Sequence, residues 1–200
     1  MEKLLSQIEA LKQSDVKEVI DKRIQEFKDQ KEIFSEMCFC ILTANYSASG
    51  GIRIQRDIGD GFSTLSEEEL AKKLSRLGHR FPNVRANYIF GARGVDVQWA
   101  LDNLQGNDLR DWLVANVKGL GYKLASHFLR NIGYDDFAII DFHIVDILVK
   151  HDLINRPKTM TPYRYFEIEN VLSKIADKSN LTLAELDLYL WYLETGKVLK

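Results

Sequence analysis

Hydrophobic residues recur every three or four positions along nearly the whole chain, and no run alternates in the way a β-strand would. This period is that of a helix with one buried face. Residues 31–44 are more apolar than the rest, which predicts a central helix that is buried on all sides. The pattern therefore predicts an all-α protein of about ten helices joined by short turns.

Capping signals indicate where these helices begin and end. Ser66-x-x-Glu69 and Thr182-x-x-Glu185 have the capping-box pattern, and Thr161-Pro162 is a cap followed by a first-turn proline. Further starts are predicted at Asn83, Asn107 and Asp141, and breaks at Gly50-Gly51, Gly59-Asp60-Gly61, Gly78, Gly133 and Gly196. Since there is no linker and no internal repeat, we predict one unit, residues 1–200, made of two helical lobes around a cleft.

Composition narrows the functional classes only slightly. The formal net charge of −2 argues mildly against a nucleic-acid partner, so any DNA contact must depend on a local surface. No apolar run is long enough to span a membrane, and the N-terminus carries charges where a signal peptide needs an apolar core, so we expect a cytoplasmic protein with no membrane partner. Cys38 and Cys40 are too few for an iron–sulfur cluster and are expected to be buried thiols.

The strongest chemical signal is Val117-Lys118-Gly119-Leu120-Gly121-Tyr122-Lys123, with helical sequence on both sides. Two glycines around one leucine allow a sharp turn between two helices and a close approach of the backbone to another surface. The second helix begins with unpaired backbone N–H groups, which can bind a phosphate. A protein of negative net charge can therefore still bind DNA here, through Lys118, Gly119 and Gly121.

The pattern continues with Asn131-x-Gly133 and an apolar run that ends in Ile140-Asp141-x-His143. In order and spacing it resembles the DNA glycosylase superfamily, with the helix–hairpin–helix at about 109–132. The resemblance implies that Lys123 is a nucleophile that forms a Schiff base with the sugar and that Asp141 stabilises the positive charge developing there. The structural alternatives are a solvated lysine at a helix start and an aspartate that only caps a helix.

The same resemblance bears on metals and cofactors. It implies no cofactor and no metal held by side chains, with His143 a structural histidine. It does imply a monovalent cation at main-chain carbonyls of the hairpin, those of Ala115, Val117 and Leu120.

A narrower resemblance covers most of the chain. It is to the compact second class of 8-oxoguanine DNA glycosylase/lyase, which is all-helical and lacks both an N-terminal β-domain and an iron–sulfur cluster. The matching residues are Leu42-Thr43-Ala44-Asn45, the segment 78–89, the segment 125–130, and Trp191-x-Leu193-x-x-Gly196-x-x-x-Lys200. The resemblance implies a DNA repair enzyme that acts on damaged double-stranded DNA, removes 8-oxoguanine and cleaves the abasic strand by β-elimination. Because the chemistry at one lesion requires only one copy of the protein, we expect a monomer.

The resemblance also implies roles for residues outside the hairpin. Phe81 and Trp191 are expected to stack on the extruded base, and the terminal carboxylate of Lys200 to accept hydrogen bonds from it. Asn45 is expected to enter the gap that the base leaves. The phosphate contacts are expected from Arg80, Arg85, Lys118 and Arg130. The alternatives are core packing for the aromatic residues, a frayed end for Lys200, a helix C-terminal asparagine for Asn45, and solvated charges for the rest.

Two other functions are compatible with the sequence. The first is a glycosylase of the same fold that removes another damaged base. The second is a non-catalytic helix–hairpin–helix module that binds the DNA backbone. This second function explains the glycines but gives no reason for a Lys123 and Asp141 pair.

Overall fold

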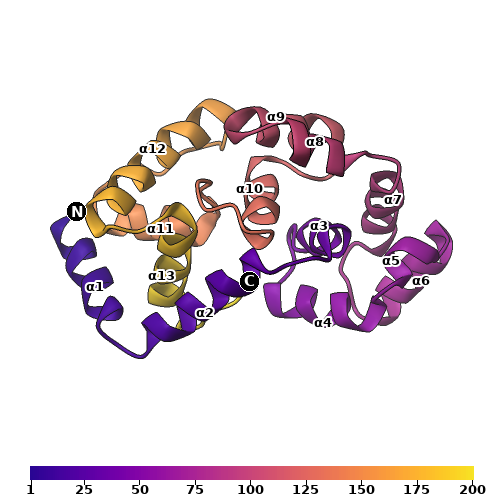
Figure 1. The fold of residues 1–200 in the computed structure, drawn as a ribbon, viewed down its shortest axis with the longest axis horizontal. Helices are drawn as coiled ribbons and strands as arrows, with labels where there is room; N and C mark the ends of the chain where they lie inside the picture. Colours follow the sequence, from indigo (N-terminus) through magenta and orange to yellow (C-terminus); the bar gives the residue numbers. More distant parts are fainter. The chain divides into compact units, whose positions relative to one another are not determined.

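The computed structural model describes all 200 residues, and the chain is built from thirteen helices with no strand (Figure 1). The all-α prediction is confirmed, although the helices are more numerous than the ten or so expected. The chain forms two compact units. Unit 1 contains residues Met1–Gln30 and Leu129–Lys200, and unit 2 contains Lys31–Phe128.

Unit 1 is organised around α13 (Leu183–Thr195), which packs against four other helices (Figure 1). These are α1 (Glu2–Lys12), α2 (Val16–Lys28), α11 (Phe142–Lys150) and α12 (Pro162–Ser179). A helix with neighbours on several sides must be apolar around most of its surface. Accordingly, α13 buries Ala184, Leu186, Leu188, Tyr189 and Leu190.

Unit 2 is organised around α3 (Ile33–Leu42), which packs against α4 (Ala48–Ile58) and α7 (Pro82–Ala92). Every residue of α3 from Glu36 to Leu42 is buried, so the prediction of a buried central helix is confirmed. The other helices are α5 (Gly61–Thr64), α6 (Glu67–Arg76), α8 (Val97–Asn103) and α9 (Gly106–Asn116), and α10 (Tyr122–Asn131) runs from unit 2 into unit 1.

Both predicted capping boxes are present, at Ser66 and at Thr182, and Thr161 caps α12 as expected. The predictions for Asn83 and Asn107 are wrong by one or two residues. Helix α7 begins at Pro82 after Phe81, and α9 begins at Gly106 after Gln105. Pro82 suits the first turn because it has no N–H to satisfy there, and the Asn107 side chain accepts a hydrogen bond from Arg110 at 2.8 Å instead of capping.

The predicted break at Gly50-Gly51 is also wrong, since both glycines lie inside α4. Ser47 caps this helix by accepting the N–H of Gly50 at 3.1 Å. A Cβ at Gly50 would lie 2.5 Å from the ring of Tyr46, so glycine is needed here for close packing and not for a turn. Cys38 and Cys40 are fully buried, as predicted, and burial raises the pKa of the Cys38 thiol. None of the helices has the length and apolar character needed to cross a membrane.

Candidate active site

The hairpin in unit 2 joins the end of α9 to the start of α10. Val117 follows α9 with an extended backbone, and its carbonyl accepts the N–H of Leu120 at 3.1 Å, which closes the turn. Val117 and Leu120 are buried. The apolar residues of the motif therefore hold the turn against the core of unit 2, as the sequence predicts.

The two glycines of the hairpin have different surroundings. Gly119 has a φ of +99°, and an added Cβ would lie 2.5 Å from the ring of Tyr88. Both facts require glycine. Gly121 is exposed, and nothing lies within 4 Å of the position where its Cβ would be. Gly119 thus serves the packing of the hairpin, whereas Gly121 leaves the backbone open to an outside molecule.

Lys123 lies in the first turn of α10 and is half-buried. The first N–H groups of a helix have no partner within it, and the positive end of the helix dipole favours an anion. Lys118 is exposed, and its Nζ lies 5.3 Å from the centre of the Tyr88 ring. A cationic side chain and a helix N-terminus therefore flank the exposed Gly121.

Asn45 lies at the exposed tip of the turn between α3 and α4, with a left-handed φ of 58°. Two side chains hold this turn. Arg85 donates to the carbonyl of Ala44 at 2.8 Å, and His79 Nε2 lies 2.9 Å from the carbonyl of Leu42. They satisfy one carbonyl oxygen at the end of α3 and one in the turn that follows it. Arg85 is buried, so its predicted role as a surface phosphate contact is wrong.

Phe81 precedes α7 and is half-buried. Its N–H donates to His79 Nδ1 at 3.1 Å, which links it to the turn that carries Asn45. The Leu42 carbonyl can only accept, so Nε2 carries a proton. Since Nδ1 accepts the N–H of Phe81, His79 is neutral. Burial lowers the pKa of His79, which favours this neutral form. The guanidinium of Arg80, an exposed residue, lies 5.0 Å from the centre of the Phe81 ring.

In unit 1, Asp141 caps helix α11, as the sequence predicts. Its Oδ1 accepts the N–H groups of His143 at 2.9 Å and Ile144 at 3.1 Å. Asp141 itself is only half-buried. The cap fixes the carboxylate at the positive end of a helix, where a negative charge is stabilised.

Phe142 and His143, which follow Asp141 in the chain, form an aromatic cluster with Trp191. The Phe142 and His143 rings are 3.9 Å apart, and the His143 ring meets Trp191 edge-on at 4.8 Å. His143 is thus a packing residue, and no group of three or more metal-binding side chains is present. Phe142, which directly follows Asp141, is 65% exposed, so a large apolar ring lies open to solvent at the start of α11.

Trp191 and Lys200 both belong to the C-terminal part of unit 1. Trp191 is half-buried near the end of α13, and its indole N–H is buried without a hydrogen-bond partner. Lys200 is half-buried. Their proposed contacts with a base stay predictions.

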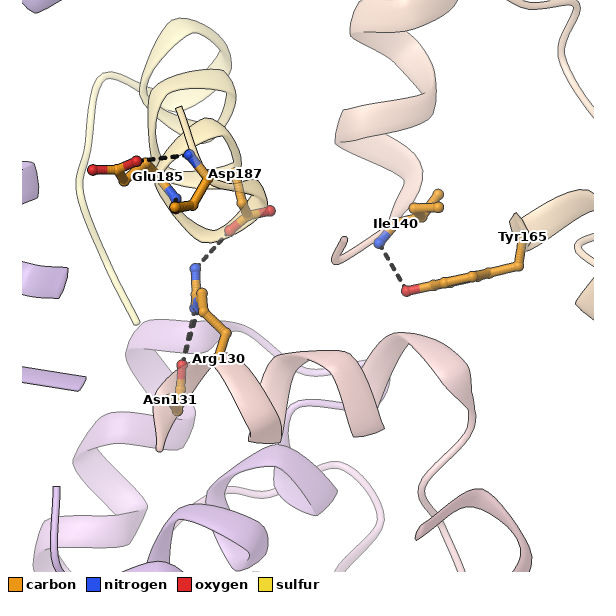
Figure 2. Close-up of polar contacts among 7 residues, drawn as sticks. Arg130, Asn131, Ile140, Tyr165, Glu185 and Asp187 are labelled. Carbon is orange, nitrogen blue, oxygen red and sulfur yellow. Dashed lines mark hydrogen bonds and ion pairs between the residues drawn. The ribbon is translucent and has the colours of Figure 1, made fainter. Parts of the chain in front are cut away.

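Arg130 does not have the role that was predicted for it. It is buried, and its guanidinium pairs with Asp187 at 2.5 Å and with Asn131 Oδ1 at 3.1 and 3.2 Å (Figure 2). The guanidinium also lies over the Phe27 ring at 4.7 Å. These contacts fix the end of α10 to α13 and α2 and keep the charge away from the surface. The prediction of a phosphate contact at Arg130 is therefore wrong.

Lys123 belongs to unit 2 and Asp141 to unit 1. The structure thus describes how each residue is held within its own unit. Their joint action in one reaction stays a prediction.

Comparison with known proteins gives consistent results over the whole chain. Residues 20–181 match the family described as 8-oxoguanine DNA glycosylase. The 8-oxoguanine DNA glycosylase/AP lyase of Methanocaldococcus jannaschii is 55% identical, and the match covers 98% of this chain and 99% of the relative. The enzyme of the same name from Korarchaeum cryptofilum is 50% identical, with 98% of each chain covered.

A solved structure agrees with these sequence matches. The crystal structure of the M. jannaschii 8-oxoguanine glycosylase/lyase, in complex with a 15mer DNA containing 8-oxoguanine, has a TM-score of 0.95 and 54% identity to this chain. The match covers 98% of this chain and 99% of that one.

Proposed function

Because this chain belongs to the 8-oxoguanine DNA glycosylase family, we propose that it removes 8-oxoguanine from double-stranded DNA and then cleaves the strand at the abasic site. The observation that carries this proposal is the full-length match to relatives named for both activities. The alternative of a non-catalytic DNA-binding module accounts for Asp141 as a helix cap but gives no reason for a half-buried lysine at the start of α10.

Lys123 is the proposed nucleophile. Its neutral amine attacks C1′, so that a bond from Nζ to C1′ forms as the bond from C1′ to the base breaks, and the base leaves with the electron pair. Opening of the sugar ring then gives a Schiff base between Nζ and C1′. Loss of a proton from C2′ expels the 3′ phosphate, which is the β-elimination step.

Asp141 is the proposed electrostatic partner. As the base leaves, positive charge develops at C1′, and a fixed carboxylate stabilises that charge more than one that must first reorient. Capping of α11 holds Oδ1 in place through two backbone N–H groups. The helix cap therefore also preorganises the carboxylate for catalysis.

The remaining residues are proposed to bind DNA and the extruded base. Gly121, Lys118 and the start of α10 would contact phosphates, and Asn45 would fill the gap in the duplex. Extruding a base loses stacking that the pocket must restore, which Phe81 and Trp191 would supply. Both rings are only half-buried, so each leaves part of its surface open for such a contact. The carboxylate of Lys200 would accept hydrogen bonds from the base.

The hairpin carbonyls of Ala115, Val117 and Leu120 suit a monovalent cation. Ala115 lies in the last turn of α9, where carbonyls lack helical partners, and Val117 lies just beyond it. Such a cation would supply positive charge near a bound phosphate. One lesion requires only one copy of the protein, so we propose a monomer that acts on cytoplasmic, nucleoid DNA.

Borohydride trapping tests this proposal. The wild type is mixed with a duplex that carries one 8-oxoguanine opposite cytosine, in parallel with Lys123→Gln and with the control Lys150→Gln, an exposed lysine at the end of α11. We expect a covalent band with the wild type and the control, and none with Lys123→Gln. An unchanged band with the Lys123→Gln variant would exclude Lys123 as the nucleophile.

The same gel separates the chemistry from the substrate. A band on a pre-made abasic site but not on 8-oxoguanine would retain the lysine chemistry and point to another damaged base. No band on either duplex would favour the DNA-binding module.

A further inference from the structure

The segment Phe137–Ile140, directly before Asp141, is buried although it belongs to no helix. Buried backbone N–H and C=O groups must find hydrogen-bond partners. In many enzymes an adjacent β-strand provides them, but this protein has no strand. The hydrogen-bond partners of this segment must therefore include groups other than a strand.

Two side chains of α12 form three hydrogen bonds with the backbone of this segment. The hydroxyl of Tyr165 donates to the carbonyl of Ala138 at 2.6 Å and accepts the N–H of Ile140 at 3.3 Å. The carboxylate of Glu169 accepts the N–H of Ala138 at 3.0 Å. Tyr165 and Glu169 are four residues apart, so they lie on the same face of the helix. Figure 2 shows the Tyr165 hydroxyl directed at the backbone nitrogen of Ile140.

We propose that Tyr165 and Glu169 are positioning residues for base excision, because they fix the backbone from which Asp141 projects. This inference rests on the proposed function. Two sets of hydrogen bonds then fix Asp141. The α12 side chains hold the backbone of residues 138–140, which precede it. The backbone N–H groups of His143 and Ile144, which follow it, bind its carboxylate. Tyr165 is 2% exposed, so it acts through Asp141 and not by touching DNA.

This role predicts an effect on the chemical step and not on binding. Tyr165→Phe keeps the ring in the core but removes both hydrogen bonds to the segment. Since small displacements of a catalytic group are costly, we expect the rate of base excision to fall about tenfold. The dissociation constant for the lesion duplex is expected to stay unchanged, because the surface that contacts DNA is unaltered.

The experiment is single-turnover excision of 8-oxoguanine with enzyme in excess. Tyr189→Phe is the matched control: Tyr189 is equally buried in the same unit, but it lies on α13. We expect Tyr165→Phe to slow excision and Tyr189→Phe to leave it at the wild-type rate. If the wild type excises 8-oxoguanine and Tyr165→Phe does so at the same rate, the positioning role alone is overturned. If the wild type excises no 8-oxoguanine, both the proposed function and the positioning role are overturned.

A double-mutant cycle shows whether Tyr165 acts through Asp141. In an Asp141→Asn background the carboxylate is already lost, so Tyr165→Phe is expected to change the remaining rate by less than about twofold. A full additional loss in that background would show a general effect on folding and would overturn the proposal.

Glu169 provides a second, independent test. In Glu169→Gln the amide oxygen can still accept the N–H of Ala138, whereas in Glu169→Ala no acceptor remains. We expect Glu169→Gln to retain most of the excision rate and Glu169→Ala to lose it at an unchanged dissociation constant. Equal rates in the two variants would contradict the role of this hydrogen bond.

Discussion

The hairpin of unit 2 and the segment before Asp141 in unit 1 each support one proposed catalytic residue, but they are held by different means. The hairpin depends on local features: a turn closed between Val117 and Leu120, and a positive φ at Gly119 that the turn itself imposes. The segment in unit 1 depends on partners far along the chain, since Tyr165 lies 25 residues after Ile140. The structural role of a residue can be predicted from the sequence where the local backbone conformation requires that residue type. It cannot be predicted where the partner is a side chain far along the chain.

Breaking the buried pair of Arg130 and Asp187 tests how strongly unit 1 depends on such distant polar contacts. Arg130→Met leaves the carboxylate of Asp187 largely buried without its cation, so we expect a loss of about 3–5 kcal/mol in the free energy of unfolding. The matched control is Arg156→Met, whose pair with Asp146 is exposed and should contribute at most about 1 kcal/mol. Urea unfolding of both variants measures this difference, and equal losses would contradict it.

The second prediction separates the cap at Asp141 from its chemistry. Asn caps a helix about as well as Asp, so Asp141→Asn should leave the stability nearly unchanged and slow base excision about 10²–10³-fold through loss of the charge. Asp96→Asn is the matched control, because Asp96 caps α8 in unit 2 through the N–H of Trp99 at 3.0 Å. It should excise at the wild-type rate. Similar rates for both variants would leave Asp141 with a structural role only.

The third prediction concerns the local side of the comparison. Gly119→Ala forces a Cβ against Tyr88 at a φ of +99°, and the strained backbone alone should cost about 1–3 kcal/mol of stability. Gly121→Ala meets nothing within 4 Å and should keep its stability but weaken binding to duplex DNA, because the Cβ projects from the exposed backbone. Thermal unfolding and fluorescence anisotropy measure the two effects. Intact DNA binding by Gly121→Ala would contradict the proposed backbone contact.

The smallest expected effect is that of His79, which contacts the carbonyl of Leu42, 37 residues away in unit 2. Burial lowers its pKa below the usual 6.5, so its stabilising contribution is complete above that value and is lost as the pH falls through the lowered pKa. Protonation removes the acceptor for the N–H of Phe81, which should cost about 0.5–1.5 kcal/mol. The stability advantage of the wild type over His79→Gln should therefore shrink between pH 8 and about pH 5. An advantage independent of pH would contradict this assignment.

The same contrast explains which residues could be predicted from the sequence. Helical periodicity, the capping boxes, the hairpin and the cap at Asp141 depend on residues a few positions apart, and the structure contains all of them. Arg85 and Arg130 were misjudged because arginine is usually exposed, and their partners Ala44 and Asp187 are 41 and 57 residues away. Tyr165 and Glu169 belong to no motif, so only the folded chain identifies them.

The burial of the two cysteines in α3 has a consequence for the conditions under which this protein can work. Oxidants attack the thiolate, and sulfenic and sulfinic acids form where a thiol is both accessible and easily deprotonated. Cys38 and Cys40 are fully buried, and the raised pKa of Cys38 keeps it protonated. A protein that repairs guanine oxidation must act while peroxides and related species are present. Its two thiols are shielded from the same agents that create its proposed substrate.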